Sequence, residues 1–396
     1  MTFWRGLRSA AIQDGVSYAW GLAIPALYLA GIPIAIPFST LFWAGGALRN
    51  AAQIKTVDWD LRDWKSTYFR ELQNVLDIQY RTVRYNLPQI LLHENPAGKD
   101  INSYQLLFDV QAKPFALSPQ TRAITEKGFE AVMDRLRKKS TYYEETHIRL
   151  LDIQEVQSGL RLTVQPVSFA DYLRTNLLLD YRQGDQPTLR ELVHPDGSLE
   201  PLSSSGLANS MGINVLVFTA SGCLVLQKRS RKVGIRPGEY APSGSGGMTI
   251  ADAISAGSAG VKPITIIREV TEEIGINVDS KIESTLTYMG ITRELIRGGM
   301  PEIFFCAQSD FTERDILQAC KRARDRHEFA KVRIFPLGKF ATRALHTFDD
   351  AQSLSSEVDR LLDRIWNEAS IPLLTALALW VRQKRITLLN HARLAT

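Results

Sequence analysis

The chain has 396 residues, more than one ordinary domain needs and enough for two or three segments. Hydrophobic residues make up 45% and charged residues 22%, which is typical of a folded protein and excludes a chain disordered throughout. Lysine and arginine number 47 against 42 acidic residues, and this small, dispersed surplus does not indicate a nucleic-acid-binding protein. The three cysteines show no metal-ligand spacing, and their odd number suits a reducing compartment.

The first expected element is an uncharged run, residues 16–48, which contains no Asp, Glu, Lys or Arg. As a helix it would measure about 50 Å, against roughly 30 Å of bilayer hydrocarbon. Pro25, Pro33 and Pro37 would bend or break such a helix, so we expect a single-pass or re-entrant membrane segment. Two alternatives stay open. One is a secretory signal, although the run is long for one and shows no convincing cleavage site; the other is a buried hairpin.

The next stretch, residues 55–140, is expected to be helical. Apolar residues at helical spacing between Leu72 and Val83 predict an amphipathic helix. Ser118 followed by Pro119 predicts the start of a second helix, which runs to about Lys139.

Short strands are expected from about residue 142 onward. Alternating or apolar runs predict the strands 147–153, 160–167, 213–219 and 223–228, the last two forming a hairpin. Between these pairs lie a short helix, 169–176, and a Pro-, Gly- and Ser-rich connector, 187–206. The apolar stretch 371–381 is too short to span a bilayer and predicts a packed C-terminal helix.

The stretch from Arg268 to Ile276 carries the chemistry. On a helix, Glu269, Glu272 and Glu273 lie at positions i, i+3 and i+4 and therefore share one face. Three adjacent carboxylates repel one another unless a hard divalent cation lies between them, and Mg²⁺ or Mn²⁺ prefers such oxygen ligands. These three glutamates are therefore the candidate metal ligands.

These residues resemble the Nudix hydrolases, whose box reads G-x5-E-x7-R-E-U-x-E-E-x-G-U, where U is aliphatic. The right half of the box matches at every fixed position from Arg268 to Ile276. The resemblance implies that Gly246 and Gly247 let the backbone approach the metal and the diphosphate, a close approach that glycine allows. It also implies that Arg268 orients the glutamates.

The left half of the box departs from the family pattern. Twenty residues separate Gly247 from Arg268, more than the pattern allows, and its first glutamate is missing. In the family that glutamate mainly braces the arginine, and Asp252 is the candidate replacement.

The likeness continues downstream. Strands are expected at 287–292, 303–309 and 331–336, and a helix at 353–367. The layout is similar to that of the mammalian Nudix protein that cleaves UDP-glucose and UDP-galactose. The shared features are the Tyr172–Asn176 segment, the Arg229-Ser230 step and His327-Glu328 before a late strand.

The resemblance implies an α+β fold, a Nudix α/β/α sandwich with a mixed sheet. A helical and β extension and the N-terminal membrane segment would precede it. The expected divisions are an apolar segment at 1–54, a helical region at 55–140, an α/β extension at 141–206, the Nudix domain at 207–370 and a C-terminal helix at 371–396.

The implied activity is metal-dependent hydrolysis of a nucleoside diphosphate linked to another moiety, possibly a UDP-sugar. Glu328 and Glu302 are the candidate general bases, and Arg229 is a candidate substrate-binding residue. The expected partners are this small molecule and a membrane, with the catalytic part in the cytoplasm. The alternative is a membrane-attached nucleotide sensor with a degenerate Nudix pocket and little turnover.

Overall fold

The computed structural model describes most of the chain after its first 63 residues. The described residues are 64–95, 104–138, 144–231, 233, 235–256, 264–276, 280–337, 340 and 343–394. All of them belong to one compact unit, residues 55–396. The uncharged run 16–48 therefore lies outside the described residues. Within the described part, no helix combines the length and the apolar character that crossing a membrane requires.

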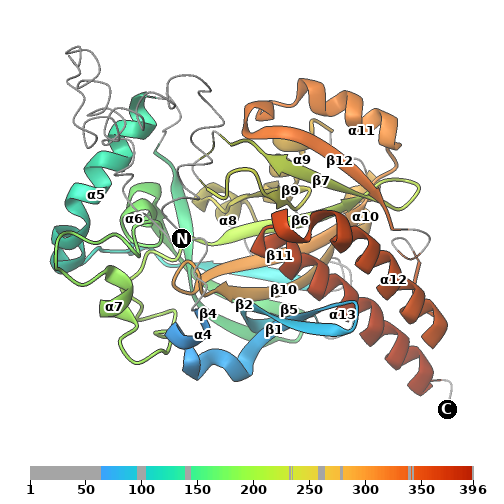
Figure 1. Cartoon of the computed structure of the whole chain (residues 1–396), viewed down its shortest axis with the longest axis horizontal. Coiled ribbons are helices and arrows are strands. Elements are labelled where there is room, and N and C mark those ends of the chain that lie inside the picture. Colours follow the sequence, from blue (N-terminus) through green and yellow to red (C-terminus); the bar gives the residue numbers. More distant parts are fainter. Residues whose placement is uncertain are drawn as a thin grey trace, which may run out of the picture. The chain divides into compact units, whose positions relative to one another are not determined.

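A large mixed sheet forms the centre of this unit (Figure 1). Along the sheet its strands are β1 (Val75–Tyr80), β2 (Val83–Glu94), β10 (Thr287–Glu294), β11 (Met300–Gln308), β6 (Gly212–Phe218), β7 (Cys223–Arg229) and β12 (Phe329–Pro336). Two short strands join it, β8 (Tyr240–Ala241) on β7 and β9 (Gly244–Gly247) on β6. β11 and β6 run parallel and the other neighbouring strands of this sheet run antiparallel, so the expected α+β class with a mixed sheet is confirmed.

Helices cover both faces of this sheet. On one face lie α8 (Ile250–Ala256), α9 (Ile264–Ile274) and α10 (Ser280–Thr285). On the other face lie α12 (Phe348–Ile365) and α13 (Ile371–Leu394). Every residue of β6 is buried, as expected for a strand covered on both sides. The expected C-terminal helix is thus confirmed, and it extends beyond residue 381.

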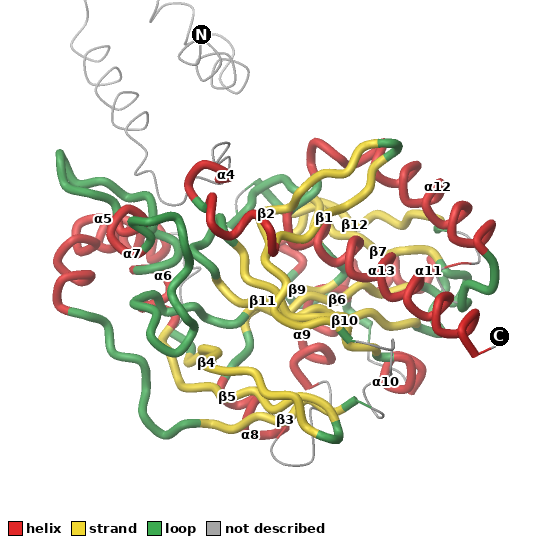
Figure 2. The backbone as a smooth tube through the Cα atoms, turned by 90° about the horizontal axis from the view of Figure 1, so that it is seen from below, coloured by secondary structure: helices red, strands yellow, loops and turns green. Residues whose placement is uncertain are grey.

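A second sheet of three strands packs beside α8 (Figure 2). It consists of β3 (Gln105–Val110), β5 (Gly159–Ser168) and β4 (Thr146–Val156). Its apolar face shares one core with α9 and the large sheet, which brings Leu106, Leu150 and Leu162 together with Val215 and Val270. The smaller sheet therefore forms one wall beside the acidic helix.

The remaining elements are helices at the edges of the unit. In the described part of the chain they are α4 (Trp64–Thr67), α5 (Pro119–Lys138), α6 (Phe169–Arg174), α7 (Leu189–Val193), α11 (Glu313–Ala319) and the 3₁₀ turns at Phe69–Asn74, Cys320–Arg322, Arg326–Glu328 and Trp366–Glu368. The Thr121 amide donates to the Ser118 hydroxyl over 3.0 Å, so the predicted cap and start of α5 are confirmed.

The helical prediction for residues 55–140 is wrong at residues 75–94 and at Gln105–Val110, which form strands. The amphipathic helix expected between Leu72 and Val83 is replaced by a 3₁₀ turn and by β1, and β2 and β3 follow. In β1, Leu76 and Ile78 are buried while Asp77 and Gln79 lie on the other side, which is the period of a strand. β2 pairs with β10, so these residues pack better as a strand than as a helix. β10 is far from β2 in the sequence, and a local pattern does not indicate this pairing.

Candidate functional site

The acidic helix α9 packs on the large sheet through one side and carries its glutamates near the other. Val270 and Ile274 are fully buried in the core. The helix ends at Gly275, whose φ of 77° is the left-handed conformation that glycine adopts easily. The predicted helix and its glycine stop are therefore confirmed.

The glycine-rich strand β9 lies directly against Glu269. A Cβ atom placed on Gly246 would come within 2.3 Å of the Glu269 Oε1, far inside van der Waals contact. A Cβ on Gly247 would lie 2.6 Å from the Cε1 of His147. Only glycine lets the strand approach the carboxylate and the imidazole so closely. The structure thus brings Gly246 and Gly247 close to Glu269 and Arg268 of α9.

Glu273 is the most deeply held of the three glutamates. Its Oε2 accepts the backbone amide of Ser245 over 2.8 Å and the side-chain amide of Gln227 over 3.3 Å. Burial, with the nearby charge of Glu269, raises the pKa of Glu273 well above its ordinary value, and Arg229 opposes this increase. A deeply buried carboxylate with so few donors is poised to accept a cation.

Glu269 is also buried, and its environment is mixed. Burial raises the pKa of Glu269 to about 7, while Arg268 lowers it and Glu272 raises it further. The Arg268 Nη2 lies 2.9 Å from the Glu269 Oε1. The two buried carboxylates, Glu269 and Glu273, therefore share one poorly compensated negative region.

Arg268 connects the helix to the preceding turn. Its guanidinium lies 3.4 Å from Glu272 and 3.5 Å from Asp252, and it donates to the Gly247 carbonyl over 3.3 Å. Asp252 therefore braces the arginine despite the long interval between Gly247 and Arg268.

The outer side of the site is formed by the segment before β12. Glu272 forms an ion pair with Arg324, and its backbone carbonyl accepts the Asp325 amide over 2.9 Å. Glu328 lies close by, with its Oε2 3.7 Å from the Arg229 Nη2. Arg229 and Glu328 thus lie at the edge of the acidic region.

The structure places Glu302 elsewhere. Ile303 points into the core with Val270, so the adjacent Glu302 points to the opposite face of the sheet. There its carboxylate pairs with Arg297 over 2.6 Å and accepts the Gln89 amide over 3.0 Å. A carboxylate held in this way on the other face is not positioned as a base for the α9 site.

His147 was missed by the sequence reasoning. It comes from β4 in the smaller sheet and lies over Gly247, with its Nδ1 2.8 Å from the Ser210 hydroxyl and its Nε2 3.3 Å from Glu145. Burial lowers the pKa of His147, so the imidazole is neutral near pH 7. The only available signal was the place of His147 in a predicted strand. Such a prediction does not indicate which part of the chain the strand packs against.

The donor chemistry of the site fits a hard divalent cation. Within the described ranges, no group of three or more His, Cys, Asp or Glu side chains converges in a ready metal geometry. Glu269, Glu272, Glu273 and Asp252 nevertheless supply carboxylate oxygens in one region, against the guanidinium groups of Arg268 and Arg324. The excess of oxygen donors and of negative charge suits Mg²⁺ or Mn²⁺.

The raised pKa of Glu269 predicts a pH-dependent stability. Because the folded protein holds this proton up to about pH 7 and the unfolded chain releases it near pH 4.3, unfolding free energy falls as the pH rises between these values. The expected loss is on the order of 2 to 3 kcal/mol. Urea unfolding in EDTA at pH 5 and pH 8 measures it. Glu269→Gln is expected to remove this part of the pH dependence, and an identical slope in both proteins contradicts the assignment.

Comparison with known proteins finds similarity to solved structures alone. No protein-family model matches the sequence, and no curated protein is significantly similar to it. Among solved structures, DR0079 from Deinococcus radiodurans matches at 12% identity and a TM-score of 0.23, over 40% of this chain and 83% of that chain.

Two further matches are crystal structures of a bifunctional NMN adenylyltransferase/ADP ribose pyrophosphatase from Francisella tularensis, one complexed with AMP and Mn ion. Both match at 13% identity and a TM-score of 0.24, over 39% of this chain and 41% of that chain. The present chain thus spans less than half of the bifunctional protein. Similarity this low carries no argument about function.

Proposed function

We propose that this chain is a metal-dependent hydrolase of phosphoric anhydride bonds, of the Nudix type. The observation that carries the proposal is the packing of the α9 carboxylates against strand β9, where Glu269 lies against Gly246 and Glu273 accepts the Ser245 amide. Buried carboxylates that repel one another destabilise a fold, and a bound cation removes this penalty. A surface helix that matched the motif by chance would have no reason to bury them.

Glu269, Glu272 and Glu273 would hold Mg²⁺ or Mn²⁺, which when bound polarises phosphate oxygens and activates water. The protein's own residues prepare the site. Arg268 keeps Glu269 and Glu272 oriented through its ion pairs, and the Ser245 amide fixes Glu273. Glu328 is the candidate base, because it alone of the two expected bases lies beside this region.

The substrate class is a nucleoside diphosphate linked to a second moiety. The layout of Tyr172–Asn176, Arg229-Ser230 and His327-Glu328 supports a UDP-sugar as the first candidate. The Arg229 side chain is mostly buried and lies near Glu273. It would contribute a positive charge for binding the diphosphate. The uncharged run 16–48 is a reason to test lipid-linked diphosphates as well.

The test is release of a nucleoside monophosphate or a phosphate monoester in Mg²⁺. The panel contains UDP-glucose, UDP-galactose, ADP-ribose and a lipid-linked diphosphate. We expect turnover of at least one of them and a loss of kcat of about 10²- to 10⁴-fold in Glu272→Gln. Glu283→Gln, an exposed glutamate on α10, is the matched control and should keep full activity.

One outcome would favour the sensor instead. If the wild type and Glu272→Gln are equally inert on the whole panel but still bind nucleotide, the catalytic proposal fails. The long interval between Gly247 and Arg268 was the argument for a degenerate pocket. The contact between Arg268 and Asp252 weakens that argument, because Asp252 braces the arginine despite the long interval.

A further inference from the structure

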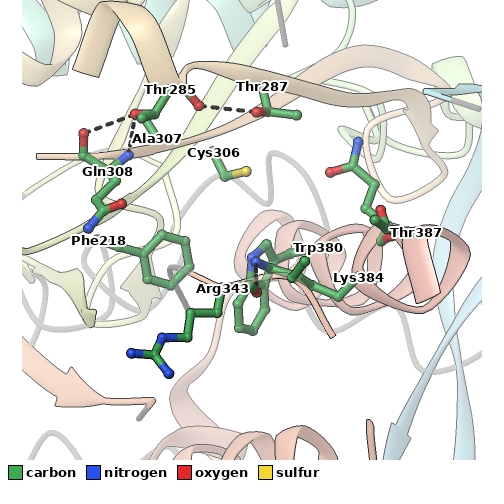
Figure 3. Close-up of a pocket in the computed structure, with 12 residues that line it drawn as sticks. Phe218, Thr285, Thr287, Cys306, Ala307, Gln308, Arg343, Trp380, Lys384 and Thr387 are labelled. Atoms are coloured by element: carbon green, nitrogen blue, oxygen red, sulfur yellow. Dashed lines mark hydrogen bonds between the residues drawn. The ribbon is translucent and has the colours of Figure 1, made fainter. Parts of the chain in front are cut away.

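A second pocket opens on the opposite face of the large sheet. Its volume is about 270 Å³, and it lies between the ends of β10 and β11, the middle of α13 and residues 343–344 (Figure 3). The lining residues are Phe218, Thr285, Thr287, Cys306, Ala307, Gln308, Arg343, Ala344, Trp380, Gln383, Lys384 and Thr387. None of the residues named so far for the α9 site contributes to it.

The strand register separates this pocket from the α9 site. Gln308 is aligned with Phe218 at one end of β6, whereas Gly247 is aligned with Gly212 at the other end. Phe218 belongs to the core under α13, and its neighbour Val217 belongs to the core under α9. The two sites therefore differ both in the face of the sheet and in the end of the strand.

An apolar floor forms one side of the pocket. The rings of Phe218 and Trp380 lie with their centroids 5.1 Å apart at an angle of 33°. The Cys306 thiol lines the same space (Figure 3). Burial raises the pKa of Cys306 to about 11, so the thiol is neutral at pH 7 and serves as wall rather than as nucleophile. This side of the pocket suits a flat ring.

The other side of the pocket is positively charged. Arg343 and Lys384 both line it, and the Lys384 ammonium donates to the Arg343 carbonyl over 2.8 Å. This bond joins α13 to the backbone of the segment that carries Arg343. Among the described residues that line the pocket, none is Asp or Glu. Burial lowers the pKa of Lys384, and a bound anion would oppose that effect.

Most of the smaller polar groups are already engaged. Thr285 donates to the Gln308 carbonyl over 3.0 Å and accepts the Gln308 amide over 2.9 Å, and Gln383 donates to the Tyr288 carbonyl over 2.7 Å. These bonds fix the strand ends and the helix around the opening. The wall is therefore preformed, and Arg343 and Lys384 are the positively charged residues that line it.

We propose that this pocket binds a small phosphorylated ring compound, no larger than a nucleoside monophosphate. Arg343 and Lys384, which line the same opening, match the negative charge of a phosphate monoester, and the apolar floor formed by Phe218 and Trp380 receives the ring. The volume sets the upper limit of size. The site is independent of the proposed hydrolysis at α9, and its occupant would act as a second ligand of the same chain.

Cys306 provides a reporter that only this pocket contains. In a chain with Cys223→Ser and Cys320→Ser, Cys306 is the single thiol. Its slow alkylation at alkaline pH, where a fraction of the thiol is ionised, measures access to the pocket. The probes are phenyl phosphate, UMP, inorganic phosphate and phenol. We expect phenyl phosphate or UMP to slow the labelling of Cys306 several-fold, and phenol or inorganic phosphate to protect far less.

Lys384→Gln and Arg343→Gln are each expected to raise the concentration needed for protection about tenfold. Arg333→Gln, an exposed arginine on β12, is the charge-matched control and should leave protection unchanged. Arg343 is itself exposed, so its replacement keeps the test valid if Lys384→Gln fails to fold. Three outcomes overturn the proposal: no probe protects Cys306, inorganic phosphate protects as well as phenyl phosphate, or both variants protect like the control.

Discussion

Glu273→Gln is expected to abolish most of the catalytic activity and at the same time to stabilise the metal-free fold. The glutamine keeps the size of the side chain, and its carbonyl can still accept the Ser245 amide. It cannot carry the negative charge that a cation requires. We expect kcat/KM on the best substrate of the panel to fall about 10³-fold.

The expected gain in stability of Glu273→Gln follows from the burial of Glu273. Glu273 is almost fully buried, and burial together with the charge of Glu269 raises its pKa. At neutral pH the fold must either bury this charge or bind a proton, and the neutral glutamine needs neither. The variant should therefore unfold at a higher urea concentration than the wild type in EDTA.

Parallel assays of activity and of urea unfolding measure the two effects. Mg²⁺ should stabilise the wild type and should stabilise Glu273→Gln much less, because a ligand stabilises only the state that binds it. Glu283→Gln serves again as the matched control, with neither effect. A variant that loses activity because it is less stable would contradict this account of Glu273.

Glu294→Gln is expected to be the most destabilising single change among those considered. Glu294 is fully buried and lies between Arg236 and Arg297, with which it forms ion pairs. Burial raises the pKa of Glu294, but the two guanidinium groups outweigh it and hold the pKa below its usual value. Removing this charge leaves Arg297 paired with Glu302 and Arg236 paired with the more exposed Glu239 over 3.5 Å.

The expected loss of unfolding free energy is about 3 to 5 kcal/mol, the usual result of breaking a buried ion pair on one side. Chemical unfolding followed by circular dichroism measures it. Glu357→Gln removes the carboxylate of a partly exposed pair with Arg360 and should cost less than about 1 kcal/mol. Equal losses in the two variants would show that the cluster does not stabilise the fold.

The same cluster explains why Glu302 was misplaced by sequence reasoning. Its position at the start of a strand suggested a carboxylate near the catalytic helix. The strand alternates its side chains, and only the packing of Ile303 against Val270 decides which face Glu302 takes. Gln89, one of its partners, comes from a strand that the sequence pattern suggested was helical.

The sequence alone determined the features that depend on neighbours along the chain. The acidic helix, its glycine stop at Gly275 and the capped start of α5 at Ser118 were predictable, because their hydrogen bonds close within a few residues.

Only the tertiary structure decided which distant elements meet. It made strands of residues 75–94, set His147 over Gly247 and gave Asp252 to Arg268. It also formed the second pocket from strand ends and α13, which are far apart in the sequence. Such contacts depend on strand pairing and on shared cores, and a local pattern of residue types does not record either of them.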